Sequence, residues 1–218
     1  KKNKSLDSVY EVRRAYERLG LELANFQRLF MKTDSDKKIG DTVIHGDFKC
    51  LNLFYDHENG HFTFIDNASM VRTLEKLGNA KSDIIKIIFG NFSVLEDVNI
   101  RTLLQGVNIG KWYQEIIGSF VKGYAEAFPA SERIDVIREL QALFNSGSYN
   151  SDSVIYEEQK IKSLVLKYVD SVFNSLLGEK KQSSNKLTQR QEEEQNLTEL
   201  TALIKVAKSN FDESFKRF

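Results

Sequence analysis

The stretch HGDFKCLNLFYDHENGHFTFID, residues 45–66, joins a polar loop to two short runs rich in aromatic residues. The runs at 53–56 and 61–66 predict two strands of a β-hairpin. Asn59 and Gly60 between them form a strong hairpin signal, since both residue types tolerate a positive φ. Before the loop, TVIH (42–45) contains β-branched residues and predicts another short strand. We therefore expect the polar loop to lie between two strands.

The rest of the chain is dominated by helical patterns. Residues 6–30 predict a long helix with one buried face, because apolar residues recur there at steps of three and four. That face consists of Val9, Val12, Tyr16, Leu19, Leu23, Phe26 and Phe30. After Asp66 we expect helices at about 82–90, 96–105, 110–128 and 153–177. Another helix should follow Pro129 and Ser131 and run to about Phe144, with Ile134, Ile137, Leu140 and Phe144 pointing inward. The sequence thus predicts a mostly α-helical α+β fold with a small β-hairpin.

The domain organisation follows from changes in composition along the chain. Residues 1–178 are expected to form one domain, which ends at Gly178, a natural helix-terminating residue. The polar segment 179–189 predicts a linker or a frayed helix, and 190–218 predicts an amphipathic helix. That terminal helix either docks on the same domain or binds a partner, and the sequence leaves both alternatives open.

Charge and cysteine content restrict the function classes. The chain has 31 basic and 31 acidic residues, so no net charge attracts nucleic acid or an anionic membrane. A single cysteine, Cys50, cannot form an internal disulfide, which favours a reducing, cytoplasmic location. No apolar run reaches the roughly 20 residues of a transmembrane segment, and the opening residues lack the apolar core of a signal peptide. Small-molecule or protein partners are therefore favoured over nucleic acid.

Oxygen-bearing side chains are concentrated around the predicted hairpin. Asp47 and Asn52 belong to the loop, and Asp66 ends the second strand, so the three are expected to converge at one edge of the hairpin. Mg²⁺ prefers such oxygen ligands and often shares them with nucleotide phosphates, which makes Asn52 and Asp66 the candidate ligands. Asp47 would then be available to accept a hydrogen bond from a substrate hydroxyl, with Lys49 as a nearby cation.

HGDFKCLN, followed by FTFIDNA (62–68), resembles the catalytic and metal-binding loops of the aminoglycoside phosphotransferase and choline kinase-like enzymes, which are relatives of the protein kinases. Those enzymes typically carry His-Gly-Asp, four residues and Asn, and then a strand that ends in Ile-Asp. The resemblance implies a protein-kinase-like C-terminal lobe and transfer of the ATP γ-phosphate to a hydroxyl group.

The same resemblance assigns roles to individual residues. Asp47 would be the catalytic aspartate, and Asn52 and Asp66 would hold Mg²⁺ and, through it, ATP. His45 would support the loop by hydrogen bonds. Lys49 matches the lysine of serine/threonine protein kinases that contacts the transferred phosphate, although it could also be a solvated surface residue.

The resemblance is incomplete, which keeps several alternatives open. The HGD form favours a small molecule or a lipid head group as acceptor, whereas Lys49 favours a protein. No GxGxxG motif is present, so we expect the nucleotide-binding N-terminal lobe either upstream in a longer protein or on a partner chain. A pseudokinase or scaffold without a complete nucleotide-binding lobe is the main alternative. A nucleotidyl transferase is a third one.

Asp83, in the predicted helix at 82–90, has two possible roles. It could be a charge at the helix N-terminus, or it could brace the catalytic loop by hydrogen bonds, as an aspartate after the metal loop does in the resembling enzymes. Cys50 has no evident base nearby in the sequence, and we interpret it as a small buried residue. The aromatic residues of 110–128 are expected to be mostly core.

Overall fold

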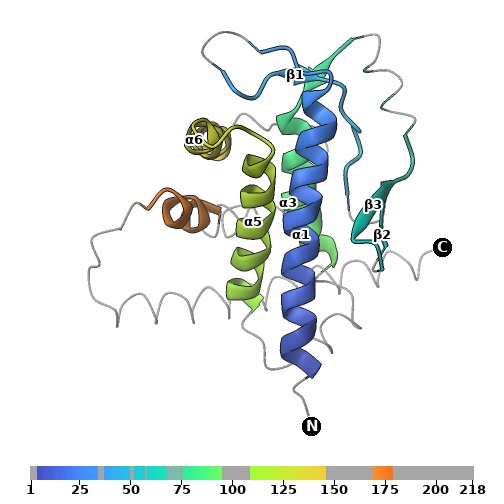
Figure 1. Cartoon of the computed structure of the whole chain (residues 1–218), viewed down its shortest axis with the longest axis vertical. Helices are drawn as coiled ribbons and strands as arrows, with labels where there is room; N and C mark the ends of the chain where they lie inside the picture. The colour runs from blue at the N-terminus through green and yellow to red at the C-terminus, as the bar shows by residue number, and fades with distance from the viewer. Residues whose placement is uncertain are drawn as a thin grey trace, which may run out of the picture.

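The computed structural model describes residues 4–33, 37–49, 52–56, 58–67, 70, 73, 76–94, 109–145 and 169–178. Several predicted features lie outside these residues: the helix at 96–105, most of that at 153–177, the segments 179–189 and 190–218, and Cys50. The described residues form a mostly helical α+β fold with two small antiparallel sheets, as the sequence predicts (Figure 1). None of the helices described is long and apolar enough to cross a membrane.

The long helix α1 (Lys4–Arg28) is the centre of the arrangement. Helix α5 (Ile109–Glu126) packs alongside it, and α3 (Lys81–Val94) lies behind it in the view of Figure 1. Helix α6 (Arg133–Asn145) and the helical residues 169–176 lie on the far side of α5. Buried side chains from all five helical segments meet in one hydrophobic core.

Two glycines allow α1 and α5 to come into backbone contact. A Cβ atom at Gly20 would overlap the main-chain oxygen of Phe120, and one at Gly123 would overlap the main-chain oxygen of Glu17. Any larger residue at either position would push the two helices apart, because a backbone oxygen cannot rotate away as a side chain can. The crossing is therefore encoded by reciprocal glycines, one on each helix.

The predicted core faces are largely correct, with two exceptions near helix ends. Phe30 is 43% exposed, and Ile134, predicted to point inward, is 44% exposed. Helix α1 ends at Arg28, and Phe30 then donates its N–H to the Gln27 oxygen at 3.2 Å in a tighter turn, which rotates Phe30 away from the buried face. The last buried position of α1 is the polar Gln27 instead.

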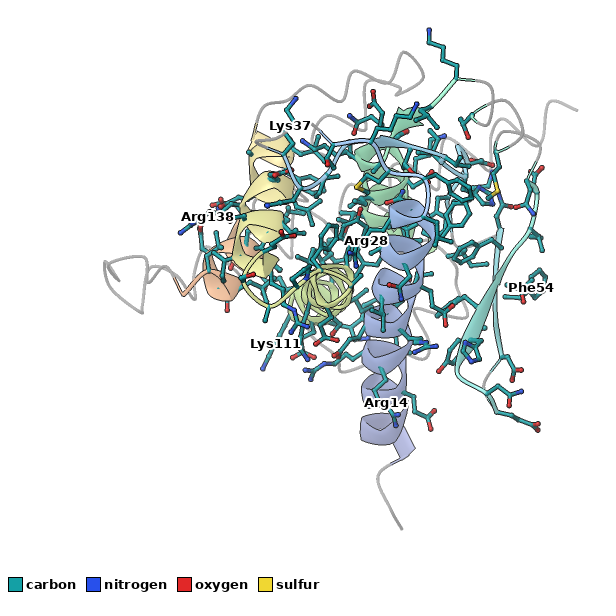
Figure 2. The ribbon with its side chains drawn as sticks, turned by 45° about the horizontal axis from the view of Figure 1, so that its top comes forward. Arg14, Arg28, Lys37, Phe54, Lys111 and Arg138 are labelled. Atoms are coloured by element: carbon teal, nitrogen blue, oxygen red, sulfur yellow. The ribbon has the colours of Figure 1, made fainter. Side chains whose placement is uncertain are left out.

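The predicted hairpin forms from β2 (Leu53–Asp56) and β3 (His61–Phe64), but β3 ends two residues before Asp66, the predicted end of the strand. At the turn, Gly60 adopts a φ of 69°, and the Asp56 carboxylate accepts hydrogen bonds from the Asn59 backbone and side chain at 3.1 and 2.7 Å. Both are local interactions, which explains why the sequence predicts the turn well. Phe54 points outward from the hairpin, away from α1, and is 61% exposed (Figure 2).

Glu22 anchors the hairpin to α1. Its carboxylate accepts hydrogen bonds from the Phe62 N–H at 3.0 Å and from Arg18 Nε at 2.6 Å, and it lies 2.9 Å from His61 Nδ1. Burial raises the pKa of Glu22, but the bonds from Phe62, His61 and Arg18 together hold that pKa below its ordinary value. The ionised carboxylate is therefore the form that fastens β3 to the helix.

The strand predicted at TVIH (42–45) is wrong beyond Thr42. Strand β1 covers only Asp41–Thr42 and pairs with β4 (Gly78–Asn79), which the sequence did not predict. The next backbone groups are bound by side chains instead: Thr73 Oγ1 accepts from the Ile44 N–H at 3.2 Å and donates to the Ile44 oxygen at 3.1 Å. With its polar groups already bonded in this way, residue 44 does not extend the β-ladder.

Candidate active site

The polar loop at 45–52 is held in place by Asp83 of α3. Its Oδ2 accepts a hydrogen bond from the His45 N–H and its Oδ1 accepts one from the Gly46 N–H, both at 2.9 Å. Helix α3 is capped by another residue, since Asn79 Oδ1 accepts the Lys81 N–H at 3.0 Å. Of the two roles left open for Asp83, the structure therefore shows the second one: Asp83 braces the loop by hydrogen bonds.

A buried relay of polar side chains holds Asp83 in turn. Gln27 of α1 donates from Nε2 to Asp83 Oδ2 at 3.3 Å and to the Ala80 oxygen at 3.1 Å. Tyr124 of α5 donates its hydroxyl to Gln27 Oε1 at 2.8 Å. Gln27, Tyr124 and Asp83 are all buried, so the loop is coupled to the centre of the helical core.

Protonation states in this relay follow from its environment. Burial raises the pKa of Asp83, while hydrogen bonds from Gly46 and His45 lower it, and the net shift is upward. Burial also raises the pKa of Tyr124, which keeps its hydroxyl protonated as a donor. Sequence reasoning did not select Gln27. The sequence did contain a pattern that could have identified Gln27, since it is a polar residue one turn after Leu23 on the buried face of α1.

His45 is buried and has the supporting role expected of it. Its Nδ1 accepts the Asp47 N–H at 3.3 Å, and its Nε2 lies 2.8 Å from the Ile65 oxygen. A carbonyl oxygen only accepts, so Nε2 carries the proton and the ring is the neutral Nε2–H tautomer. His45 thus links the loop to the end of β3, and the buried ring of Phe48 packs edge-on against it at 5.7 Å.

Asp47, Asn52 and Lys49 are brought together by the loop. Asn52 Nδ2 donates to the Asp47 oxygen at 2.9 Å and to Asp47 Oδ2 at 3.0 Å. Lys49 Nζ forms an ion pair with Asp47 Oδ2 at 2.6 Å. The hydrogen bond from Lys49 is the largest influence that lowers the pKa of Asp47, and the same contact raises the pKa of Lys49. Asp47 is thus a partly exposed carboxylate that is ready to accept a further donor.

Asp66 directly follows Ile65, whose backbone N–H and C=O groups are both hydrogen-bonded. The Ile65 N–H donates to the Asn52 oxygen at 3.0 Å, and the Ile65 oxygen accepts from His45. Asp66 itself is exposed and adopts a φ of 59°, a conformation that Asp tolerates better than most residues. Its charge also helps to raise the pKa of Lys49, after the larger contribution of Asp47. The end of the hairpin therefore places the Asp66 charge within electrostatic range of Lys49.

Lys86 is a second cation at the loop that sequence reasoning missed. Its Nζ donates to the Gly46 oxygen, and its charge contributes to the lowered pKa of Asp47 after that of Lys49. Lys86 follows Asp83 by three residues on α3, which is the spacing of neighbours on one helix face. Once Asp83 is recognised as the brace, this spacing would have identified Lys86.

The polar groups at the loop suit a hard cation that takes only two ligands from the protein and the others from a nucleotide and water. Asn52 uses its amide nitrogen for Asp47, so its oxygen is the atom left for a cation, and Asp66 offers an exposed carboxylate. Within the ranges described, no three His, Cys, Asp or Glu side chains surround a common cation position. This donor set fits Mg²⁺ bound jointly by two protein oxygens, nucleotide phosphates and water.

Comparisons with known protein families, with curated proteins and with solved structures give no match. A functional assignment for this chain therefore rests on the residues of the loop and hairpin and on their geometry.

Proposed function

We propose that the chain is part of an ATP-dependent phosphotransferase that transfers the γ-phosphate to a hydroxyl group of a small molecule or lipid head group. One observation carries this proposal. The loop at 45–52 and the end of β3 are joined through His45, Ile65 and Asn52, so Asp47 and Asp66 flank one short hydrogen-bonded unit. Kinase-like enzymes need this combination of an orienting aspartate and a metal-binding pair.

Each residue has a role that its contacts support. Asp47 would accept the hydrogen bond of the acceptor hydroxyl and orient its oxygen toward the γ-phosphorus. Its lowered pKa keeps it ionised at neutral pH, as this role requires. Asn52 and Asp66 would hold Mg²⁺, which neutralises phosphate charge when bound. Lys49, 2.6 Å from Asp47, would exchange this ion pair for contact with the transferred phosphoryl group.

The kinase-like C-terminal lobe belongs to the same proposal. A mostly helical domain with a hairpin beside its catalytic loop is compatible with it, and the sequence lacks a GxGxxG loop to cover the phosphates. The remaining nucleotide contacts would come from an upstream lobe or from a partner chain. Because Lys49 stands at the position of the lysine of serine/threonine protein kinases, a protein acceptor is the second candidate.

Paired substitutions of aspartate test the proposal. Asp66→Asn should abolish Mg²⁺-dependent ATP binding, whereas Asp47→Asn should retain binding and lower transfer of the γ-phosphate by at least about 10²-fold. Asp135→Asn, on the exposed face of α6, is the matched control and should change neither. The measurements are calorimetric titration with MgATP and release or transfer of ³²P from γ-labelled ATP by the full polypeptide.

Three outcomes would contradict the proposal in different ways. Phosphate transfer that Asp47→Asn leaves unchanged would remove the mechanism. Product mass increased by AMP instead of phosphate would indicate the nucleotidyl transferase. MgATP binding without turnover, equal in the wild type and Asp47→Asn, would favour the scaffold.

A further inference from the structure

A cleft of about 400 Å³ lies between the N-terminal half of α1, helix α5 and the helical residues 169–176. It is separate from the candidate active site. The cleft faces the α5 side of α1, whereas the hairpin lies on the opposite side (Figure 1). The loop at 45–52 is bonded to Asp83 of α3, which in turn accepts a hydrogen bond from Gln27 near the C-terminal end of α1. A molecule in this cleft would not contact Asp47 or Asp66, so any ligand would be a second one.

The wall of the cleft contains polar groups whose hydrogen-bonding capacity is unused. Ser119 of α5 is only 8% exposed, and its hydroxyl has no hydrogen-bond partner among the residues described. Ser171 and Ser175 stand one helical turn apart on the opposite wall and likewise have no partner within the described ranges. Buried hydroxyl groups are usually hydrogen-bonded, so the unpaired hydroxyl of buried Ser119 points to a hydroxylated ligand or to ordered water that it would displace. The hydroxyls of Ser171 and Ser175 are exposed and accessible to the same ligand.

The charged lining favours an anionic group on that ligand. Three basic residues, Arg13, Lys111 and Lys122, and two acidic residues, Glu17 and Glu115, line the cleft. Lys122 is paired with Glu17 at 2.7 Å. Arg13 is 3.6 Å from Glu115, too far for a direct hydrogen bond, so its guanidinium retains its donors. A planar guanidinium with open donors matches a phosphate or carboxylate in bidentate fashion.

We propose that this cleft binds a small polyhydroxylated molecule that carries one phosphate or carboxylate group. The anionic group would bind Arg13, and hydroxyls of the ligand would bind Ser119, Ser171 and Ser175. A volume of about 400 Å³ is at the lower end of the range for small-molecule sites and suits a molecule of sugar-phosphate size. The five charged side chains in the lining disfavour a lipid tail. This inference does not depend on the proposed phosphotransferase activity.

Three probes separate the features of the ligand. Glucose 6-phosphate has hydroxyls and an anion, glucose has hydroxyls alone, and inorganic phosphate has the anion alone. We expect saturable NMR shifts of the Gly118 and Ser119 amide signals with glucose 6-phosphate, and about tenfold or weaker binding of either other probe. The amide signal of Gly46, in the loop of the candidate active site, should not move.

Substitutions of residues that line the cleft test whether the probe binds there. Arg13→Gln should weaken the binding of glucose 6-phosphate about tenfold or more, because one charged contact is lost. Arg138→Gln, at an exposed arginine of α6, is the matched control and should have no effect. Arg13 is 47% exposed, so the variant should fold, and Ser171→Ala provides an independent test of the opposite wall. The proposal is overturned if no probe gives saturable shifts, or if neither variant weakens them.

Discussion

Alanine substitutions at three helical glycines test the crossing of α1 and α5. Each substitution gains about 1 kcal/mol in helix propensity. At Gly118 the new methyl would meet only Val172 Cγ1 at 3.6 Å, an ordinary contact, so Gly118→Ala should stabilise the fold by about 1 kcal/mol. At Gly123 the Cβ position lies 2.7 Å from the carbonyl carbon of Glu17, and at Gly20 it lies 2.8 Å from a backbone nitrogen of α5.

The methyl at Gly20 or Gly123 would meet backbone, which cannot change rotamer. Separation of the helices should cost about 3 kcal/mol, the upper end of the overpacking range. After the gain in helix propensity, each variant should be about 2 kcal/mol less stable than the wild type. For a chain of this size the midpoint temperature should fall by about 4–8 °C, whereas that of Gly118→Ala should rise by about 2–4 °C.

Urea unfolding provides the assay. Trp112, the single tryptophan, lies half-buried on α5 and reports on the packing of this helix by fluorescence, and circular dichroism reports the helical content. The sign of the effect is the decisive quantity, because the same chemical change is made at all three positions. If Gly20→Ala and Gly123→Ala stabilise the protein as Gly118→Ala does, the backbone contact between α1 and α5 is refuted.

Three further predictions concern the loop and the hairpin anchor. Asp83→Ala leaves the buried N–H of His45 and the part-buried N–H of Gly46 without their acceptor and should lower the free energy of unfolding by about 2–4 kcal/mol, measured by urea unfolding; a change below about 1 kcal/mol would contradict the brace. The ¹⁵N NMR spectrum of the His45 ring should show protonated Nε2 and unprotonated Nδ1, and the reverse tautomer would be inconsistent with its two contacts. Because the folded-state pKa of Glu22 is lowered, its ionised form stabilises the fold above its unfolded-state pKa, and this contribution is lost as pH falls through the folded-state pKa. The stability difference between the wild type and Glu22→Gln should therefore shrink from pH 7 to about pH 3, and a constant difference would argue against an ionic anchor.

Features encoded by neighbouring residues were predictable from the sequence. The hairpin turn depends on Asp56, Asn59 and Gly60, and the helix end at Gly178 depends on one residue with a φ of 71°. The periodic faces of α1 and α5 also follow from local spacing. Errors appeared where this spacing met a helix end, as for Phe30, or where side chains replaced a strand partner, as at Ile44.

The relay behind the loop could not be predicted from local patterns. Gln27 meets Asp83 and Tyr124 across 56 and 97 residues of sequence, and only the packing of α1 with α3 and α5 brings them together. The candidate site residues at 45–66 were identifiable because their chemistry is concentrated in one stretch. The groups that hold them, including Lys86, are distributed over three helices.

The reciprocal glycine contact between α1 and α5 also bears on how the chain folds. It joins segments about one hundred residues apart. Closing a loop of this length costs conformational entropy, which contacts between residues close in sequence do not offset. The crossing and the relay above it should therefore form late and together, near the rate-limiting barrier, while the hairpin turn can form early as an isolated unit. The loop at 45–52, shaped by such distant contacts, would acquire its final geometry only when the helices have docked.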